Sequence, residues 1–393
     1  MLSLIQSPTA PEFVQNPYPF YAKARSQGPL HFWQDYDMPA AFSYDLVNAV
    51  LRDRRFGREI PSELARPGPA HLAPFLALES HSMLDAEPPR HTRLRALVMR
   101  AFTSRAIKAL TGDLTTLSYQ LIDAFPKDSF DLIGAFCNQI PVITIARLLG
   151  VPDHCAPDLL AWSHAMVAMY MANRTRAVED AAAQASAEFT EFLRAHIETH
   201  RATPRDDLIT QLIAAEQDGS QLSTDELIST VILLLNAGHE ATVHSLANGV
   251  KTLLETGSDL SCLEPDQIAA TVNELLRFDP PLHMFTRYAY ENLTLAGHSF
   301  QRGDQIALLL GAANRDPAIW SHPNQFDPTR PAQTHTSFGG GLHFCVGAPL
   351  ARLELEIALP ILFNRCPNLR LTSPPTYANS YHFHGLTQLW VAR

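Results

Sequence analysis

The stretch Ser337-Phe338-Gly339-Gly340-Gly341-Leu342-His343-Phe344-Cys345-Val346-Gly347 decides the fold. It places a cysteine in a glycine-built loop, directly before an amphipathic helical stretch. Helix N-termini are partially positive and thiolates are the metal-binding form of cysteine, so this position favours a metal-binding sulfur anion. Three of the glycines are expected to adopt dihedral angles that side chains forbid and to bring backbone amides close to the sulfur: Gly339, Gly341 and Gly347.

A buried, inert cysteine is the simplest alternative for Cys345, because free cysteines are often core residues. That alternative explains neither the three glycines nor the helix that follows. A structural zinc cluster is disfavoured, because the other cysteines form no C-x-x-C pair: Cys137, Cys155, Cys262 and Cys366.

Composition describes a globular protein with a large core. The chain has 393 residues, of which 46% are hydrophobic and 18% charged. No linker or repeat interrupts it, so we expect one domain over residues 1–393. Residues 1–20 contain four prolines and no apolar signal region, and the longest apolar stretch, residues 231–235, is too short to span a membrane. Scattered cysteines fit a reducing compartment. We expect a soluble, cytoplasmic monomer.

The net charge of −10 opposes nucleic-acid binding. Apolar periodicity and turn residues predict a mainly α fold with small β-sheets near both ends of the chain. Strands are predicted at 30–42 and 286–310. Helices are predicted at 90–108, 114–124, 141–149, 158–170, 177–201 and 223–255.

The helix predicted at 223–255 is long enough to cross the whole domain, at about 45 Å. It begins with a capping box from Ser223 to Glu226, and Gly257 lies just past its end. Its middle reads Ala-Gly-His-Glu-Ala-Thr at residues 237–242, where the glycine costs about 1 kcal/mol relative to alanine. One interpretation is close helix packing at Gly238 with a solvated Glu240; the other is a functional role for both.

The spacing Phe-Gly-x-Gly-x-His-x-Cys-x-Gly in residues 338–347 resembles the haem-ligand signature of the cytochrome P450 family. The resemblance covers nearly the whole chain. It implies a triangular, helix-dominated fold with haem b between a long distal helix and a proximal cysteine loop. Cys345 would be the axial ligand of the haem iron, Gly347 would belong to the cofactor-binding loop, and Phe338 would pack on the proximal side of the macrocycle.

The same resemblance implies catalytic roles in the long helix. Gly238 would line the groove for dioxygen at a kink, and Glu240 would help to relay protons. Members commonly carry an acid followed directly by threonine, whereas this chain has Ala241 there and Thr242 one residue later, about 100° further around the helix. A substrate hydroxyl, Thr242 or a water molecule would then serve in place of the missing alcohol, or peroxide would replace dioxygen; we favour the first two.

Two further sets of residues support the cofactor. Glu274 and Arg277 match the family's Glu-x-x-Arg pair, and Arg330 in Phe-Asp-Pro-Thr-Arg is the candidate third member. The same spacing at 87/90, 191/194 and 198/201 is interpreted as surface or loop pairs. Haem propionates need cations or donors, and four residues match the family's propionate positions: His91, Arg95, Arg287 and His343.

The resemblance implies a monooxygenase that inserts one oxygen atom of O2 into a hydrophobic small molecule. No flavin, dinucleotide or iron–sulfur motif is present, so a ferredoxin and a ferredoxin reductase are the expected electron donors. A basic patch would attract the ferredoxin: Arg93, Arg100, Arg105, Lys108, Arg352 and Arg365. The substrate pocket is expected to draw on a mobile loop at 60–84, the helix before Gly238, and residues 282–285 and 381–384. A peroxygenase, a haem-based gas sensor and a helical scaffold without haem remain alternatives.

Overall fold

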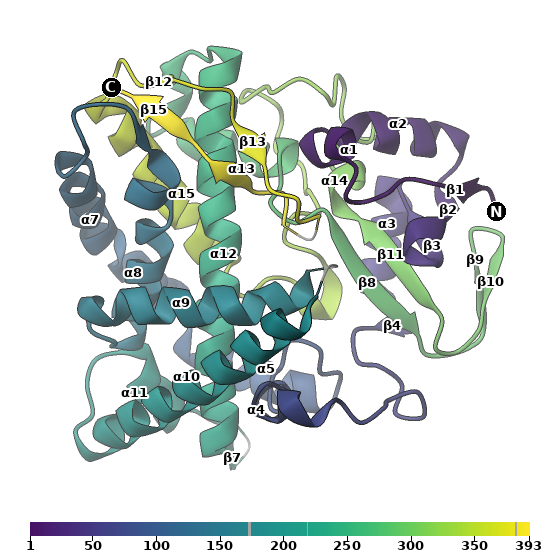
Figure 1. Ribbon diagram of the computed structural model, residues 1–393, viewed down its shortest axis with the longest axis horizontal. Helices are drawn as coiled ribbons and strands as arrows, with labels where there is room; N and C mark the ends of the chain where they lie inside the picture. The colour runs from purple at the N-terminus through teal and green to yellow at the C-terminus, as the bar shows by residue number, and fades with distance from the viewer. Residues whose placement is uncertain (172–173, 218, 382) are drawn as a thin grey trace.

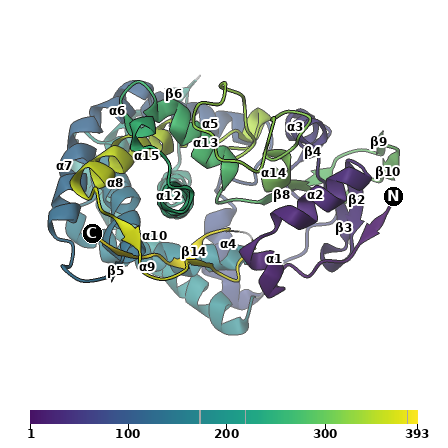
Figure 2. The same ribbon diagram turned by 90° about the horizontal axis from the view of Figure 1, so that it is seen from above.

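The computed structural model describes residues 1–171, 174–217, 219–381 and 383–393. Helices surround one long helix, α12 (Thr224–Thr256), which runs through the full height of the molecule in Figure 1. A β-sheet occupies the side that carries the N-terminus, away from most of the helices, as the view along α12 shows (Figure 2). The prediction of a mainly α fold with small β-sheets is confirmed.

The described residues form the following elements. The remaining α-helices are α1 (Pro11–Gln15), α2 (Tyr18–Gln27), α3 (Tyr44–Arg52), α4 (Ala73–Glu79), α5 (Arg90–Ala101), α6 (Ser104–Ala109), α7 (Thr111–Asp123), α8 (Gln139–Leu149), α9 (Ala156–Val167), α10 (Arg176–Ala202), α11 (Leu208–Ala214), α13 (Ile268–Phe278), α14 (Leu310–Ala313) and α15 (Ala348–Arg365). The strands are β1 (Ser3–Leu4), β2 (Leu30–Trp33), β3 (Met38–Ala41), β4 (Phe56–Gly57), β5 (Phe130–Asp131), β6 (Glu216–Gln217), β7 (Ser220–Gln221), β8 (Met284–Ala289), β9 (Leu293–Leu295), β10 (His298–Phe300), β11 (Gln305–Leu309), β12 (Arg370–Leu371), β13 (Thr376–Tyr377), β14 (Leu386–Gln388) and β15 (Trp390–Ala392).

Helix α12 begins and ends where the sequence predicts. The Ser223 hydroxyl accepts a hydrogen bond from the Glu226 amide at 3.2 Å, and the Glu226 carboxylate accepts one from the Ser223 amide at 2.9 Å. Gly257 ends the helix in the left-handed conformation, with φ of 58°. Because α8, α9, α13 and α15 all pack against α12, its apolar residues are buried on several faces.

The prediction of one continuous helix at residues 90–108 is wrong, because this segment forms two helices. α5 ends at Ala101, and α6 starts at Ser104. Between them Thr103 has extended backbone angles, and its hydroxyl accepts a hydrogen bond from the Ala106 amide at 3.2 Å. This N-cap starts a new helix and turns the chain away from the axis of α5.

The two predicted strand clusters meet in one sheet, whereas β9 and β10 of the second cluster pair with each other as a separate two-stranded sheet. The strands of the shared sheet follow the order β1-β2-β3-β11-β8-β4 within the described chain. β3 pairs in parallel with β11, with Ala40 opposite Ala307, and β11 pairs antiparallel with β8, with Ile306 opposite Arg287. Segments from the two ends of the chain are therefore joined, and β8 carries Arg287 toward the Cys345 loop. Among the described helices, none has both the length and the apolar character needed to cross a bilayer.

Candidate active site

The Cys345 loop is a tight turn that depends on glycine. Gly339 and Gly341 have φ values of 68° and 64°, in the left-handed region that favours glycine. A Cβ atom on Gly341 would collide with the Leu51 carbonyl oxygen at the end of α3. The Cys345 amide donates a hydrogen bond to the Phe338 carbonyl at 3.0 Å, which closes the loop just before α15.

Gly347 has a different reason to be glycine from the one predicted. Its φ and ψ of −78° and −1° are ordinary right-handed values that any residue adopts. A Cβ atom there would lie 3.8 Å from the Cys345 sulfur. The missing side chain therefore leaves space beside the sulfur and does not relieve backbone strain.

The charge state of Cys345 differs from the expectation. Burial within the surrounding protein raises the pKa of the Cys345 thiol, although the amides of Gly347 and Ala348 and the nearby Arg95 and Arg352 act in the opposite direction. The helix start alone does not make the thiolate the favoured form at neutral pH. A metal ion that replaced the proton would supply the remaining stabilisation.

Two of the predicted propionate residues are polar groups without a full set of partners. His91 is 2% exposed, and its Nδ1 has no hydrogen-bond partner within the described chain. Burial, with His343 and Arg95 nearby, lowers the pKa of His91 to about 4, so its ring is neutral. Arg287 is 3% exposed, and its guanidinium donates to the Thr286 carbonyl at 2.8 Å.

No carboxylate of the described chain forms an ion pair with Arg287 or Arg95. Burial, followed by repulsion from Arg58, lowers the pKa of Arg287 to about 10. A buried cation without a counterion is costly, so this corner of the molecule is built to accept an anionic group. These residues fit the propionates of haem.

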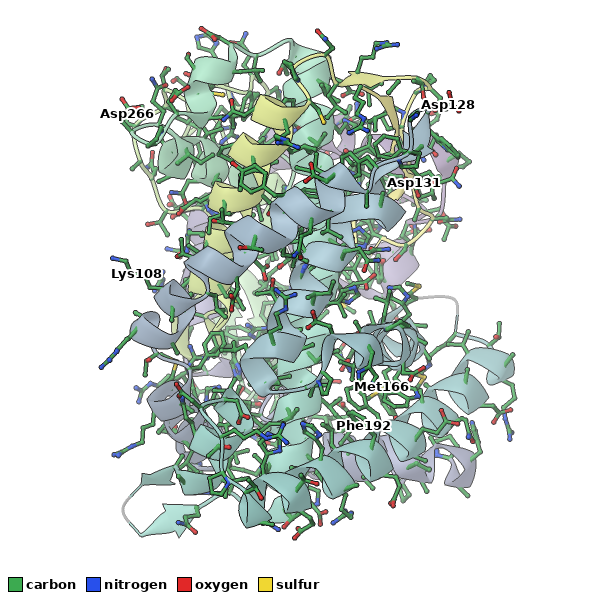
Figure 3. The ribbon with its side chains drawn as sticks, turned by 90° about the vertical axis from the view of Figure 1, so that its left-hand side faces the viewer. Lys108, Asp128, Asp131, Met166, Phe192 and Asp266 are labelled. Atoms are coloured by element: carbon green, nitrogen blue, oxygen red, sulfur yellow. The ribbon has the colours of Figure 1, made fainter. Side chains whose placement is uncertain are left out.

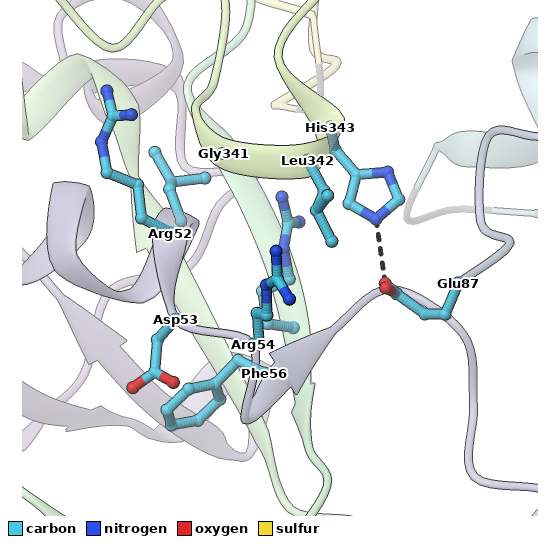
Figure 4. A pocket seen from close by; sticks show the side chains of 10 residues that line it. Arg52, Asp53, Arg54, Phe56, Glu87, Gly341, Leu342 and His343 are labelled. Carbon is cyan, nitrogen blue, oxygen red and sulfur yellow. Dashed lines mark hydrogen bonds and ion pairs between the residues drawn. The ribbon is translucent and has the colours of Figure 1, made fainter. Parts of the chain in front are cut away.

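The fourth predicted propionate residue, His343, already has a partner. Its Nε2 lies 2.9 Å from the Glu87 carboxylate, as Figure 4 shows, and its ring centroid lies 4.4 Å from that of His91. Arg287, Glu87 and His343 line one cavity of about 240 Å³ beside the Cys345 loop. The interpretation of Glu87 and Arg90 as a surface or loop pair is wrong, because Glu87 pairs with His343 and Arg90 contacts Glu59 at 3.5 Å.

The Glu-x-x-Arg network is buried and complete. Arg277 donates two hydrogen bonds to Glu274, at 2.6 and 2.7 Å, and the two side chains are 2% and 4% exposed. Arg330 donates to the same carboxylate at 3.3 Å, which confirms it as the third member. Arg277 also donates to the carbonyls of Asn314 and Pro323, both at 2.9 Å. The network thus fixes α13 to the chain that leads into the Cys345 loop.

Of the predicted distal residues, Gly238 and Ala241 lie on one open strip of α12, whereas Glu240 and Thr242 contact other side chains. A Cβ atom on Gly238 would meet no atom of the described chain within 4 Å, so close helix packing does not explain this glycine. Ala241, one turn later, is partly exposed. Thr242 is buried; its hydroxyl donates to the Gly238 carbonyl at 3.0 Å and also bonds Glu354 of α15. The helix stays α-helical through Gly238, so any kink does not break it.

Glu240 lies among three histidines and is only 13% exposed, which excludes a solvated face. Its carboxylate oxygens lie 3.4 Å from His164 Nε2, 3.6 Å from His239 Nδ1 and 3.3 Å from His244 Nε2. Burial alone would raise the pKa of Glu240, but the hydrogen bond from His244 and the charges of the histidines lower it to about 2. The carboxylate is therefore ionised at neutral pH.

The segments predicted to surround the substrate are only partly loops. Residues 60–84 include α4, whose Phe75 and Leu78 are buried with Leu72 in the main core. The prediction of a loop is therefore wrong for residues 73–79, where α4 stands. Leu282 forms a β-bridge with Phe383, and Tyr381 bonds the Tyr21 hydroxyl at 2.7 Å. His382, also predicted here, lies outside the described residues.

The predicted basic patch is smaller than expected. Arg93 forms an ion pair with Glu226, and Arg365 with Asp123. The Arg352 guanidinium lies over the Phe338 ring, 4.5 Å from its centroid. Two exposed cations remain on α6, which packs against α15: Arg105 and Lys108. Lys108 projects from the edge of the molecule in Figure 3.

Sequence reasoning missed three groups in this site: Glu87, Glu354 and the histidines around Glu240. His239 and His244 flank Glu240 at i−1 and i+4, a spacing that was available as a signal. His164 and Glu354 come from other helices, so no local pattern connects them with Glu240 or Thr242.

Comparisons with known proteins agree on one family. A family model described as "Cytochrome P450" matches residues 268–378. The chain is 36% identical to the polyketide biosynthesis cytochrome P450 PksS of Bacillus subtilis, covering 95% of this chain and 94% of that protein. It is 35% identical to the cytochrome P450 monooxygenase PikC of Streptomyces venezuelae, covering 93% and 87%. The crystal structure of P450BioI with a hexadec-9Z-enoic acid-ligated acyl carrier protein has a TM-score of 0.91 at 32% identity, covering 97% and 99%.

Proposed function

The chain belongs to the cytochrome P450 family, which makes it a monooxygenase with haem b as cofactor, and we propose that it oxidises a hydrophobic organic molecule with electrons from a ferredoxin. The observation that carries this proposal is the Cys345 loop beside the unpaired buried Arg287. One feature supplies a sulfur ligand, and the other supplies a counterion for a carboxylate.

Cys345 is the residue that would hold the haem iron, and a thiolate in this position would support the oxygen activation that the cofactor supplies when bound. The amides of Gly347 and Ala348 hydrogen-bond the sulfur and stabilise its negative charge. Phe338 lies next to this loop under the Arg352 guanidinium, where the ring shields the sulfur from water.

The propionates are assigned to His91, Arg95, Arg287 and His343. Arg287 supplies an unneutralised positive charge, and His91 supplies a free ring nitrogen. Arg95 donates to the Phe344 carbonyl at 2.8 Å, which places its charge next to the ligand loop. Glu87 holds the His343 ring and so acts as a positioning residue.

Proton delivery is assigned to the Glu240 carboxylate. His164 is 48% exposed and Glu240 is 13% exposed, so a proton can pass from solvent through His164 to the buried carboxylate. Ala241 carries no hydroxyl, and Thr242 faces α15. We assign the missing alcohol function to a substrate hydroxyl or a water molecule on the open strip at Gly238.

The proposed electron donor is an acidic ferredoxin, itself reduced by a ferredoxin reductase. The exposed cations of α6 support this choice, because they lie on the helix that packs against α15, directly after the ligand loop. We also propose that residues 1–393 form one domain, that the protein is monomeric and that it works in the cytoplasm.

Turnover in an atmosphere of ¹⁸O₂ tests the function. The holoenzyme is supplied with a ferredoxin, its reductase, NADPH and a set of apolar compounds that perturb the haem spectrum. We expect one ¹⁸O atom in each product molecule. Product that forms only with added peroxide, and takes its oxygen from that peroxide, would instead establish a peroxygenase.

A further inference from the structure

One cluster of side chains has the composition of a metal site and lies away from the haem ligand. It joins two helices: His164 of α9, and His239 and Glu240 of α12. α9 crosses α12 in Figure 1, and the two helices pack together. Two histidines and one carboxylate are the ligand set that Zn²⁺ uses in open, three-ligand protein sites.

The distances suit a small tetrahedral ion. Glu240 Oε2 lies 3.4 Å from His164 Nε2 and 3.6 Å from His239 Nδ1, and the ligating atoms of all three residues lie within 4.8 Å of one another. Ligands about 2.0–2.1 Å from a tetrahedral Zn²⁺ stand roughly 3.4 Å apart. The first two separations therefore need only small rotations of the side chains.

Unsatisfied atoms provide an independent reason to expect a ligand. His239 is 0% exposed, and within the described chain neither of its ring nitrogens has a hydrogen-bond partner. Glu240 Oε2, which faces both histidines, also has no such partner. Buried polar groups in this state are costly, and one cation would satisfy Glu240 Oε2 and one of the two His239 ring nitrogens.

The remaining surroundings prepare the site for a cation. His244 Nε2 lies 3.3 Å from Glu240 Oε1 and so holds the carboxylate with its second oxygen turned toward the other histidines. His164 is 48% exposed and gives a metal ion access from solvent.

A second cluster with similar composition lacks these properties. Asp279, His283 and His384 are buried together, but the hydroxyls of Tyr18 and Tyr377 already donate to Asp279. Tyr21 bonds His283, and the Arg315 guanidinium stacks 3.4 Å from the Tyr18 ring centroid. His283 Nε2 lacks a hydrogen-bond partner within the described chain, but the Asp279 carboxylate already accepts two hydrogen bonds, and the charge of Arg315 acts on both histidines, which opposes a metal ion.

We propose that His164, His239 and Glu240 form a binding site for a divalent transition-metal ion of the zinc type, which ties α9 to α12. His244 orients the carboxylate from outside the ligand set. A metal ion bound to the Glu240 carboxylate prevents that group from delivering protons, so the ion inhibits turnover. This inhibition rests on the proposed function, whereas the metal site does not.

The test uses the tag-free holoenzyme, ZnCl₂ as the probe, and isothermal titration calorimetry with metal analysis after dialysis. The test variant is His164→Asn. His164 is the exposed ligand, so its substitution leaves the core intact. The matched control is His322→Asn, which removes an exposed histidine outside the cluster. We expect one Zn²⁺ per chain in the wild type and in the control, and binding at least about 100-fold weaker in His164→Asn.

Zinc-edge anomalous scattering from crystals soaked in ZnCl₂ gives the location, and a peak between α9 and α12 is expected. Equal zinc affinity in His164→Asn and the wild type, or no stoichiometric binding in the wild type, would overturn the proposal. Zinc that binds at this position but leaves turnover unchanged would support the site and contradict the role of Glu240 in proton delivery. The two inferences therefore fail separately.

Discussion

Replacing Glu274 with glutamine should destabilise the protein far more than removing any surface ion pair. Glu274 forms ion pairs with both Arg277 and Arg330, and it also accepts a hydrogen bond from the Asp327 amide at 3.0 Å. Glu274→Gln preserves the volume but leaves two guanidinium groups, 2% and 9% exposed, without their ion-pair partner. Breaking a buried ion pair in this way costs about 3–5 kcal/mol.

The size of the effect follows from the length of the chain. An unfolding entropy of roughly 2.1 cal/mol/K per residue gives about 0.8 kcal/mol/K for 393 residues. A loss of 3–5 kcal/mol therefore lowers the melting temperature by about 4–6 °C. Glu198→Gln is the matched control, because Glu198 has the same i, i+3 spacing to Arg201 but the pair is 59% and 37% exposed. The control should cost about 0.5 kcal/mol, or less than 1 °C.

Thermal unfolding of the two variants and the wild type, followed by circular dichroism in the same buffer, measures the difference. Haem content after purification is recorded in parallel, because the network positions the chain that leads to Cys345. Equal melting temperatures for Glu274→Gln and Glu198→Gln would refute the reasoning that the buried network fixes this region.

Four other outcomes are expected. Arg287→Ala should lower the haem retained per chain severalfold, and Arg287→Lys should restore part of it, because a charge is what the anion site needs. Ala241→Thr should raise the product formed per NADPH consumed; an unchanged yield would remove Ala241 from the argument on proton delivery. Between pH 7 and pH 4.5, His335→Gln should lose less stability than the wild type does. The reason is that burial, with Arg352 and Arg277 nearby, lowers the pKa of His335 in the folded protein to about 3. As the pH falls below about 6.5, the unfolded wild type gains a proton on this histidine that the folded protein does not, so the wild type loses up to about 3 kcal/mol of stability by pH 4.5. Denaturant titration at both pH values measures the free energy of unfolding of the two proteins. Finally, changing both Arg105 and Lys108 to glutamate should raise the KM for ferredoxin severalfold at low salt and much less at high salt; equal KM values at low salt would place the docking surface elsewhere.

The features that the sequence predicted well are local. The capping box of α12, the glycines around Cys345 and the Glu274–Arg277 pair each depend on residues within a few positions of one another. Such patterns report backbone angles and single helix faces directly. Arg330 was also predicted, through the resemblance of its surrounding segment to the family.

The features that were predicted wrongly or missed depend on packing between distant segments. Glu87 bonds His343 from 256 residues away, and Thr242 bonds Glu354 of another helix. Arg93 lies opposite Glu226, which removes it from the expected basic patch. The thiol of Cys345 was expected to ionise readily because a helix starts beside it, whereas the surrounding protein raises its pKa. Burial is a property of the whole fold, and no local pattern contains it.

The most direct test of the account is the absorption spectrum of the reduced, carbon monoxide-bound holoenzyme, compared between the wild type and Cys345→Ser. The wild type should show the spectrum of a thiolate-ligated haem, and Cys345→Ser should lose it. Cys366→Ser, which changes another cysteine of the chain, is the control and should retain it. A wild-type spectrum that survives the loss of the Cys345 sulfur would contradict the central claim that this residue holds the iron.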